Sequence, residues 1–199
     1  MLKISTIIAS ALAGLVATAD PSQVMAHEFT VAIVGDGLAD DPATHVAEVV
    51  RGFILATDEN DGHAFETSDG HLGGRDVQIW VLPPGGATAV AELVGTPRTT
   101  ADIALLLGPV PSAMGIGDAA LGLRTIHVRP AVLPSPETRE ASGFAGRFMA
   151  LFGRGPTDAA AQGYNAARRI DHAIRVAGDL ETRAAIRAAL AETEGGMDW

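Results

Sequence analysis

Short apolar runs alternate with segments of helical spacing along the first two thirds of the chain, and this alternation constrains the fold most. The runs at 29–34, 77–82, 103–107 and 125–128 are rich in Val, Ile and Leu, and glycine or proline follows each within two residues. Such runs are typical of parallel strands that are covered on both faces. Helical spacing is found at 45–60, 87–93 and 112–121. The order predicts a parallel sheet with right-handed crossovers.

The last third of the chain has a different character, because no further strand-like run appears after Pro136. Helical patterns cover 138–152, 157–177 and 181–193, with glycine-containing breaks at 153–156 and 178–179. Thr157 is a suitable N-cap for the middle helix. We therefore expect one α/β domain over residues 27–199, built as a single Rossmann-like lobe with a parallel sheet flanked by helices. The C-terminal helices are expected to complete that lobe.

The N-terminal segment 1–26 has the features of a secretory signal peptide. One Lys precedes an apolar run from Ile4 to Val16, and small residues follow up to Ala26. Cleavage after Ala26 would make His27 the first residue of the mature protein. Cleavage after Ala19, or an uncleaved anchor, are the alternatives. The favoured interpretation predicts export to the periplasm.

Composition excludes several functional classes. The chain has 14 Lys and Arg against 24 Asp and Glu, which gives a net charge of -10 and leaves no basic field for nucleic-acid binding. It has no cysteine, so thiol catalysis, cysteine-based zinc sites and disulfides are excluded. A core of Ala, Val, Ile and Leu must stabilise the exported protein by packing alone.

In an open α/β sheet, ligands bind beyond the carboxyl ends of the strands. The loops to consider are therefore Gly35–Asp41, Gly108–Ala113 and Arg129–Ser135. The first resembles a G-x-G-x-x-G phosphate loop, but Asp40 stands where the third glycine is needed. The second brings the Ser112 hydroxyl to the free amides of a helix start, which could hold a small carboxylate or simply cap the helix.

A loop with Asp61-Gly62-His63, Glu66 and Asp69-Gly70-His71 carries carboxylates and imidazoles close together. A divalent metal is conceivable there, but the calcium-loop pattern fails, and Asp-Gly pairs are ordinary turn formers in solvated loops. The sequence also lacks the G-x-S-x-G, H-E-x-x-H and G-x-x-x-x-G-K motifs. We therefore expect no enzyme activity, no catalytic residue, no cofactor and no metal.

Three runs carry a resemblance to a known family. They are V-A-E-V-V-R-G-F-I-L-A-T-D-E-N (46–60), H-L-G-G-R-D-V-Q-I-W-V-L (71–82) and A-D-I-A-L-L-L-G-P-V-P-S (101–112). In this order they resemble the first lobe of type I periplasmic solute-binding proteins, the Leu/Ile/Val-binding group that serves ABC importers. The helical runs 148–180 and 183–190 are similar to the helices with which that family completes this lobe. Family members carry a second lobe, and here residues 131–137 bridge the place where it would be inserted.

The resemblance implies a small-molecule site of one lobe. Ser112 falls where the family holds the carboxylate of an amino acid, and Ala131 falls where a backbone contact is made. Leu133 replaces the usual Thr, which removes one polar contact. Asp36 and Asp40, at the end of the first strand, could face an ammonium group.

These observations leave different functional hypotheses. The first is a periplasmic solute-binding component related to branched-chain amino acid transport, which binds an amino acid or related carboxylate and presents it to an ABC permease. A homodimer, or another subunit, could complete its cleft. The second is an accessory protein of the cell envelope that keeps the lobe but no longer binds a solute. An exported α/β enzyme is the third, and it lacks a recognisable set of nucleophile, base and orienting group.

Overall fold

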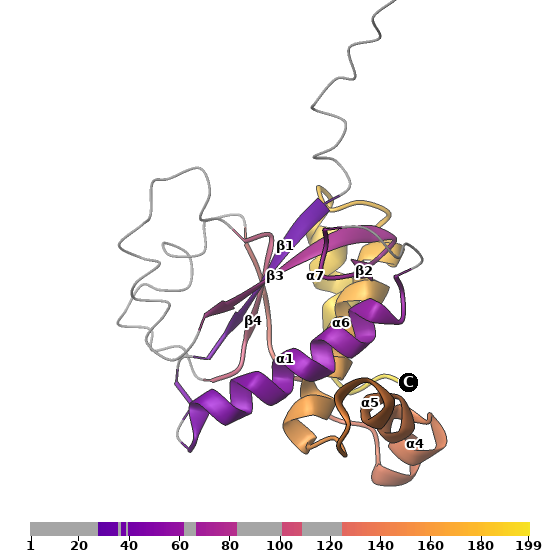
Figure 1. The fold of residues 1–199 in the computed structure, drawn as a ribbon. Coiled ribbons are helices and arrows are strands. Elements are labelled where there is room, and N and C mark those ends of the chain that lie inside the picture. The colour runs from indigo at the N-terminus through magenta and orange to yellow at the C-terminus, as the bar shows by residue number, and fades with distance from the viewer. Residues whose placement is uncertain (1–27, 36, 39, 62–66, 83–100, 109–124) are drawn as a thin grey trace, which may run out of the picture.

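The computed structural model describes residues 28–35, 37–38, 40–61, 67–82, 101–108 and 125–199. Its sheet has five strands in the order β2-β3-β1-β4-β5 (Figure 1). Strands β1 (Glu28–Val34), β3 (Arg75–Leu82), β4 (Ile103–Leu106) and β5 (Ile126–Val128) are parallel to one another. The short β2 (His71–Leu72) is antiparallel to β3. The predicted α/β class with a largely parallel sheet is confirmed.

The described helices are α1 (Pro42–Asp58), α4 (Pro136–Ala141), α5 (Phe144–Phe152), α6 (Asp158–Ala177) and α7 (Arg183–Glu192). Side-chain caps set the starts of three of them, because Asp41, Ser135 and Thr157 each accept a hydrogen bond from a first-turn amide. The helices predicted at 87–93 and 112–121 lie outside the described residues. Among the described residues, no helix is long and apolar enough to cross a membrane.

The structure differs from the predictions at two places. The single helix expected at 138–152 is divided into α4 and α5, because Gly143 adopts a left-handed conformation with φ of 73°. The strand β2 was not predicted, since two residues are too few to show a periodic pattern. It pairs through Leu72 with Arg75 across the glycine turn Gly73-Gly74.

The main core lies between one face of the sheet and the helices α1, α6 and α7. Phe29, Val31 and Ile33 of β1 point into it, together with Phe53 of α1 and Ile170 of α6. The opposite face of the sheet carries a smaller buried cluster that includes Ala32, Val34 and Leu106. Apolar residues on both faces of β1 and β4 explain why their sequences show no polar alternation.

Helices α1 and α6 cross in close contact because a glycine stands on each side of the crossing. A Cβ at Gly52 would lie 1.8 Å from the carbonyl oxygen of Ala160, and one at Gly163 would lie 1.9 Å from that of Val49. The long helix α6 can therefore lie directly against α1 (Figure 1). This packing joins the C-terminal helices to the described N-terminal half of the chain.

Candidate functional site

The carboxyl edge of the parallel strands is the first candidate site. From β1 the chain crosses to β3 on one side, and it then returns to β4 on the other side of β1. The strand order therefore reverses between β1 and β4. At such a switch point the loops after the two strands turn away from each other, and ligands of open α/β sheets bind in the crevice between them.

Backbone and side-chain hydrogen bonds hold the start of these loops together. The amide of Gly35 donates to the carbonyl of Leu82 at 2.9 Å, and that of Leu107 donates to Val34 at 3.1 Å. Beyond them, Nη1 of Arg129 donates to the carbonyl of Gly108 at 3.3 Å. The described ends of β1, β4 and β5, at Gly35, Leu107, Gly108 and Arg129, are therefore held side by side at this edge of the sheet.

Of the predicted site residues, Ala131 is the one the structure can place. It is half-buried in the segment that follows β5, and Leu133 nearby is half-buried as well. Ser112 and Asp36 lie outside the described residues, so their proximity to Ala131 stays a prediction. Asp40 is exposed just before α1. Its carboxylate therefore lies in solvent at the edge where the ligand was expected.

Buried polar side chains of α6 fix the segment that carries Ala131. Arg169 donates to the carbonyls of Arg129 (2.9 Å) and Leu190 (2.8 Å) and to the hydroxyl of Thr193 (3.0 Å). Burial lowers the pKa of Arg169, and the charge of Glu194 opposes that effect. This guanidinium thus ties the loop after β5 to the end of α7.

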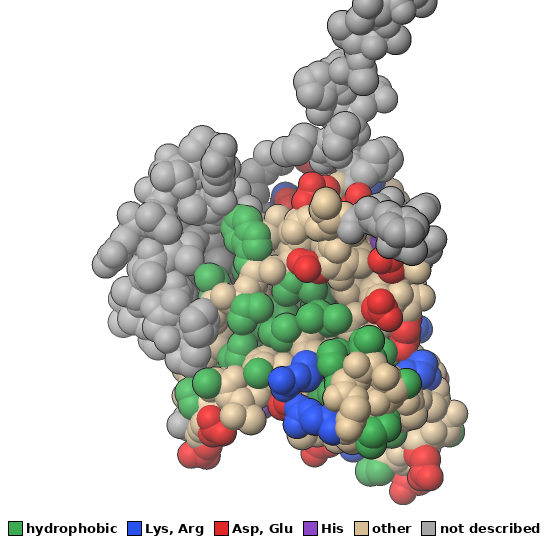
Figure 2. Space-filling model, in the orientation of Figure 1, with side chains coloured by type: hydrophobic (Ala, Val, Ile, Leu, Met, Phe, Trp, Pro, Cys, Tyr) green, Lys and Arg blue, Asp and Glu red, His purple; other side chains and the backbone are tan. Residues whose placement is uncertain are grey.

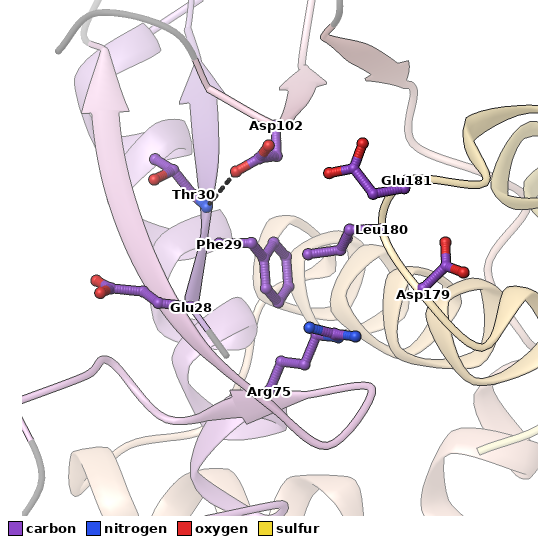
Figure 3. A pocket seen from close by; sticks show the side chains of 8 residues that line it. All are labelled: Glu28, Phe29, Thr30, Arg75, Asp102, Asp179, Leu180 and Glu181. Atoms are coloured by element: carbon purple, nitrogen blue, oxygen red, sulfur yellow. Dashed lines mark hydrogen bonds between the residues drawn. The ribbon is translucent and has the colours of Figure 1, made fainter. Parts of the chain in front are cut away.

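A hollow of about 560 Å³ lies at the opposite, amino edge of the sheet (Figure 3). Its lining comes from the start of β1, the start of β3, the residue before β4 and the loop between α6 and α7. Phe29 and Leu180 form an apolar floor, and carboxylates surround it. The charged lining residues are Glu28, Arg75, Asp102, Asp179 and Glu181. Figure 2 shows acidic side chains gathered around this end of the molecule.

Several charges of this hollow already have structural partners. A carboxylate oxygen of Asp102 accepts from the amide of Thr30 at 3.0 Å, and the other lies 3.4 Å from Nη2 of Arg183. Asp179 accepts from the amide of Thr182 at 2.6 Å, and hydrogen bonds from Thr182 lower the pKa of this carboxyl. These bonds close the sheet edge and position the start of α7, so the carboxylates of Asp102 and Asp179 are explained by folding.

The sequence interpretation did not identify this hollow. Its residues come from positions 28–30, 75, 102 and 179–181, which form no local motif. The signals that could have indicated it were Asp102 directly before an apolar strand and Asp179 directly after a helix-ending glycine. Both are residues that commonly satisfy free amides at the ends of elements.

The metal hypothesis for the Asp-Gly-His loop finds no support in the described residues. His71 Nε2 lies 2.7 Å from Asp76, while Nδ1 lies 3.3 Å from Asp61, so the carboxylates face opposite sides of the ring. One ion cannot bind both ring nitrogens. Within the described ranges, no group of three or more His, Asp or Glu side chains could hold a metal ion. His63 and Glu66 lie outside these ranges.

Comparisons with known proteins do not identify a family for this chain. No family model, no curated protein and no solved structure matches it. The structure shows a mixed α/β fold with a mostly parallel sheet, and the resemblance of the runs quoted above stays a prediction.

Proposed function

We propose that the chain is a solute-binding lobe related to the type I periplasmic binding proteins, which holds a small carboxylate at the carboxyl edge of its sheet. The observation that supports this proposal is the switch point between β1 and β4, where the carboxyl ends of the parallel strands β1, β4 and β5 lie next to one another. Helices α6 and α7 support it, because they return to the face covered by α1, in the order that the resemblance implies.

The proposed mechanism is capture and presentation, and no bond is made or broken. Amides at a helix start and the hydroxyl of Ser112 would hold the carboxylate of an amino acid, and Asp36 could pair with its ammonium. The backbone near Ala131 would contact the ligand from the loop after β5. An ABC permease would receive the solute after export of the protein to the periplasm through the segment 1–26.

A single lobe binds a small ligand weakly, because a small ligand needs most of its surface buried. We therefore propose that a second copy of the chain, or another subunit, covers the carboxyl edge. This arrangement would replace the second lobe that the bridge 131–137 omits.

An accessory protein of the cell envelope is the second candidate function. It is favoured by Leu133, which offers no hydroxyl, and by the position of the larger described hollow at the opposite edge of the sheet. In this case the lobe would serve as a binding surface for other proteins, and a solute would have no effect on its stability.

Thermal unfolding with a panel of aliphatic amino acids and small carboxylates distinguishes the two functions. A ligand that binds only the folded state raises the melting temperature in a saturable way. We expect such a rise, and we expect Ser112→Ala to abolish it. The control is Thr157→Ala, which removes the cap of α6 and lowers the melting temperature but leaves the ligand-dependent rise intact.

The mass of the protein in solution, measured with and without the ligand, tests whether a second copy completes the site. No shift with any member of the panel, from a protein that unfolds cooperatively, would contradict the solute-binding function. That outcome would favour the accessory protein.

A further inference from the structure

The side chain of Trp199 occupies a site between α5 and α6. Its ring centroid lies 4.9 Å from that of Phe144 and 4.9 Å from that of Tyr164, both in edge-to-face geometry. Its indole Nε1 donates to Oδ1 of Asn165 at 2.9 Å. Two aromatic walls and one acceptor for the ring N–H are the elements that distinguish an indole from other aromatic rings.

The walls of this site are held by bonds that do not involve Trp199. The Tyr164 hydroxyl donates to Glu59 at 2.7 Å and accepts from Nη2 of Arg147 at 2.9 Å. Phe144 contacts Phe148, with the ring centroids 5.9 Å apart. Tyr164 and Phe144 are also almost fully buried.

The side chain of Asn165, which supplies the hydrogen-bond acceptor of the site, is also oriented by a bond that does not involve Trp199. Nδ2 of Asn165 donates to the carbonyl of Val132 at 3.4 Å, which leaves Oδ1 directed at the indole. The site is therefore organised in advance for its ring, which reduces the cost of ordering it when a ligand binds.

The segment that delivers Trp199 is held much less firmly than the site. It begins at Gly195-Gly196, where Gly196 has a φ of 108°. Within the described part of the chain, the hydrogen bond from residues 197–199 to the body of the protein is the one made by the indole. A hollow of about 310 Å³ lies between this segment and Leu133–Thr138. The attachment of the segment is thus concentrated in one side chain.

We propose that Phe144, Tyr164 and Asn165 form a binding site for small indole compounds, which Trp199 fills in this structure. Residues 195–199 then act as a strap that leaves when an indole in solution takes its place. Its ring contacts are made by Phe144, Tyr164 and Asn165 and not by the predicted solute-binding residues, so the site does not depend on the proposed solute-binding function, although Asn165 is anchored on Val132 of the loop after β5. A side chain on a short tether competes at an effective concentration on the order of millimolar, so we expect a free indole to bind the intact protein weakly.

The test uses the whole protein with the substitution Trp199→Ala, which empties the site. Thermal unfolding is followed by circular dichroism with 3-methylindole, the ring of Trp without its backbone. We expect a saturable rise of about 3 to 6 °C at a tenfold excess over the dissociation constant. The unsubstituted protein should show a much smaller rise at the same concentration, because its own Trp199 occupies the site.

A matched ligand tests the hydrogen bond without altering the protein. In 1,3-dimethylindole a methyl group replaces the ring N–H, so Oδ1 of Asn165 would be buried without a donor. We expect it to bind the Trp199→Ala variant at least about fivefold more weakly than 3-methylindole. Equal effects of the two compounds, or no effect of either on a cooperatively folded variant, would overturn the proposal.

Two further outcomes are informative. If Trp199→Ala does not fold on its own, 3-methylindole should restore a cooperative transition and 1,3-dimethylindole should not. Failure of 3-methylindole to restore it would count against the site. The indole ring in the site could also come from the Trp199 of a second copy, and sedimentation of the unsubstituted protein tests this. A dimer that disappears in Trp199→Ala would assign the site to the Trp199 of a second copy and would overturn the small-molecule occupant.

Discussion

The close crossing of α1 and α6 predicts that the substitution of glycine by alanine destabilises the protein at Gly52. The same substitution should stabilise the protein at Gly146, which lies outside the crossing. Gly52→Ala would place a Cβ 1.8 Å from the carbonyl oxygen of Ala160, about 1.6 Å closer than the 3.4 Å at which ordinary van der Waals contact begins. The obstacle is helix backbone, which cannot rotate away as a side chain would. The helices must therefore separate, and the side chains packed along the crossing lose contact.

The size of the effect follows from two opposing contributions. Alanine is favoured over glycine inside a helix by about 1 kcal/mol. Overpacking of a core costs about 1 to 3 kcal/mol, and more where the backbone must move. Because the shift required here exceeds 1 Å, we expect the upper end, and a net loss of about 2 kcal/mol or more in the free energy of unfolding.

The matched control is Gly146→Ala in α5, where nothing lies within 4 Å of the added Cβ. There the helix preference acts alone, so the protein should gain up to about 1 kcal/mol. Urea unfolding followed by circular dichroism measures both changes. For a protein of this size they correspond to a melting temperature about 4 to 8 °C lower for Gly52→Ala and about 2 to 4 °C higher for Gly146→Ala.

The double substitution provides a further check on the crossing. Gly163 meets the carbonyl of Val49, so both glycines depend on the same separation of the helices. Once Gly52→Ala has separated α1 from α6, Gly163→Ala should cost less than it does alone. A stabilising Gly52→Ala, or strictly additive effects of the pair, would refute the close crossing.

Three other substitutions test the polar contacts of α6. Arg169→Lys should lower the free energy of unfolding by about 2 to 4 kcal/mol, since one ammonium cannot reach all three acceptors. The control in the same urea experiment is Arg168→Lys at the half-buried neighbouring residue, which should be nearly neutral. Thr157→Ala should cost about 1 kcal/mol because it removes the cap of α6, and Thr157→Ser should restore most of it. Burial, and then Glu59, raise the pKa of Tyr164 above its ordinary value near 10, so the neutral phenol stabilises the folded protein. This contribution is complete below about pH 10 and is lost as the pH rises through the folded pKa, a loss that Tyr164→Phe should remove. Since Tyr164 is the single tyrosine of the sequence, its ultraviolet titration reports the folded pKa directly, and a titration at the ordinary value would contradict the described burial.

The sequence predicted the strands well because their burial leaves a strong local pattern. The runs at 29–34, 77–82, 103–107 and 125–128 all contain the observed parallel strands or overlap them by most of their length. The long helix α6 was predicted almost to the residue, since Thr157 and Gly178 mark its two ends. Both signals are local, so one sequence is enough to show them.

Features that depend on distant residues were not predictable in this way. The amino-edge hollow joins four separate segments, and the indole site joins Phe144, Tyr164 and Asn165 to the far end of the chain. Helical periodicity does not show which ring lies against Tyr164. The division of 138–152 was missed because Gly143 is compatible with a helix interior until its φ is known.

The two edges of the sheet differ in what a ligand would have to displace. At the amino edge, Asp102 and Asp179 already accept backbone amides, so a cation that bound there would compete with bonds that close β1 and begin α7. Burying those amides without acceptors would cost about 1 to 3 kcal/mol each. At the carboxyl edge, the bonds of Gly35, Leu107 and Arg129 hold the described ends of the strands together. A solute that bound there, as we propose, would leave these three bonds intact, whereas a ligand at the amino edge would compete with the bonds of Asp102 and Asp179.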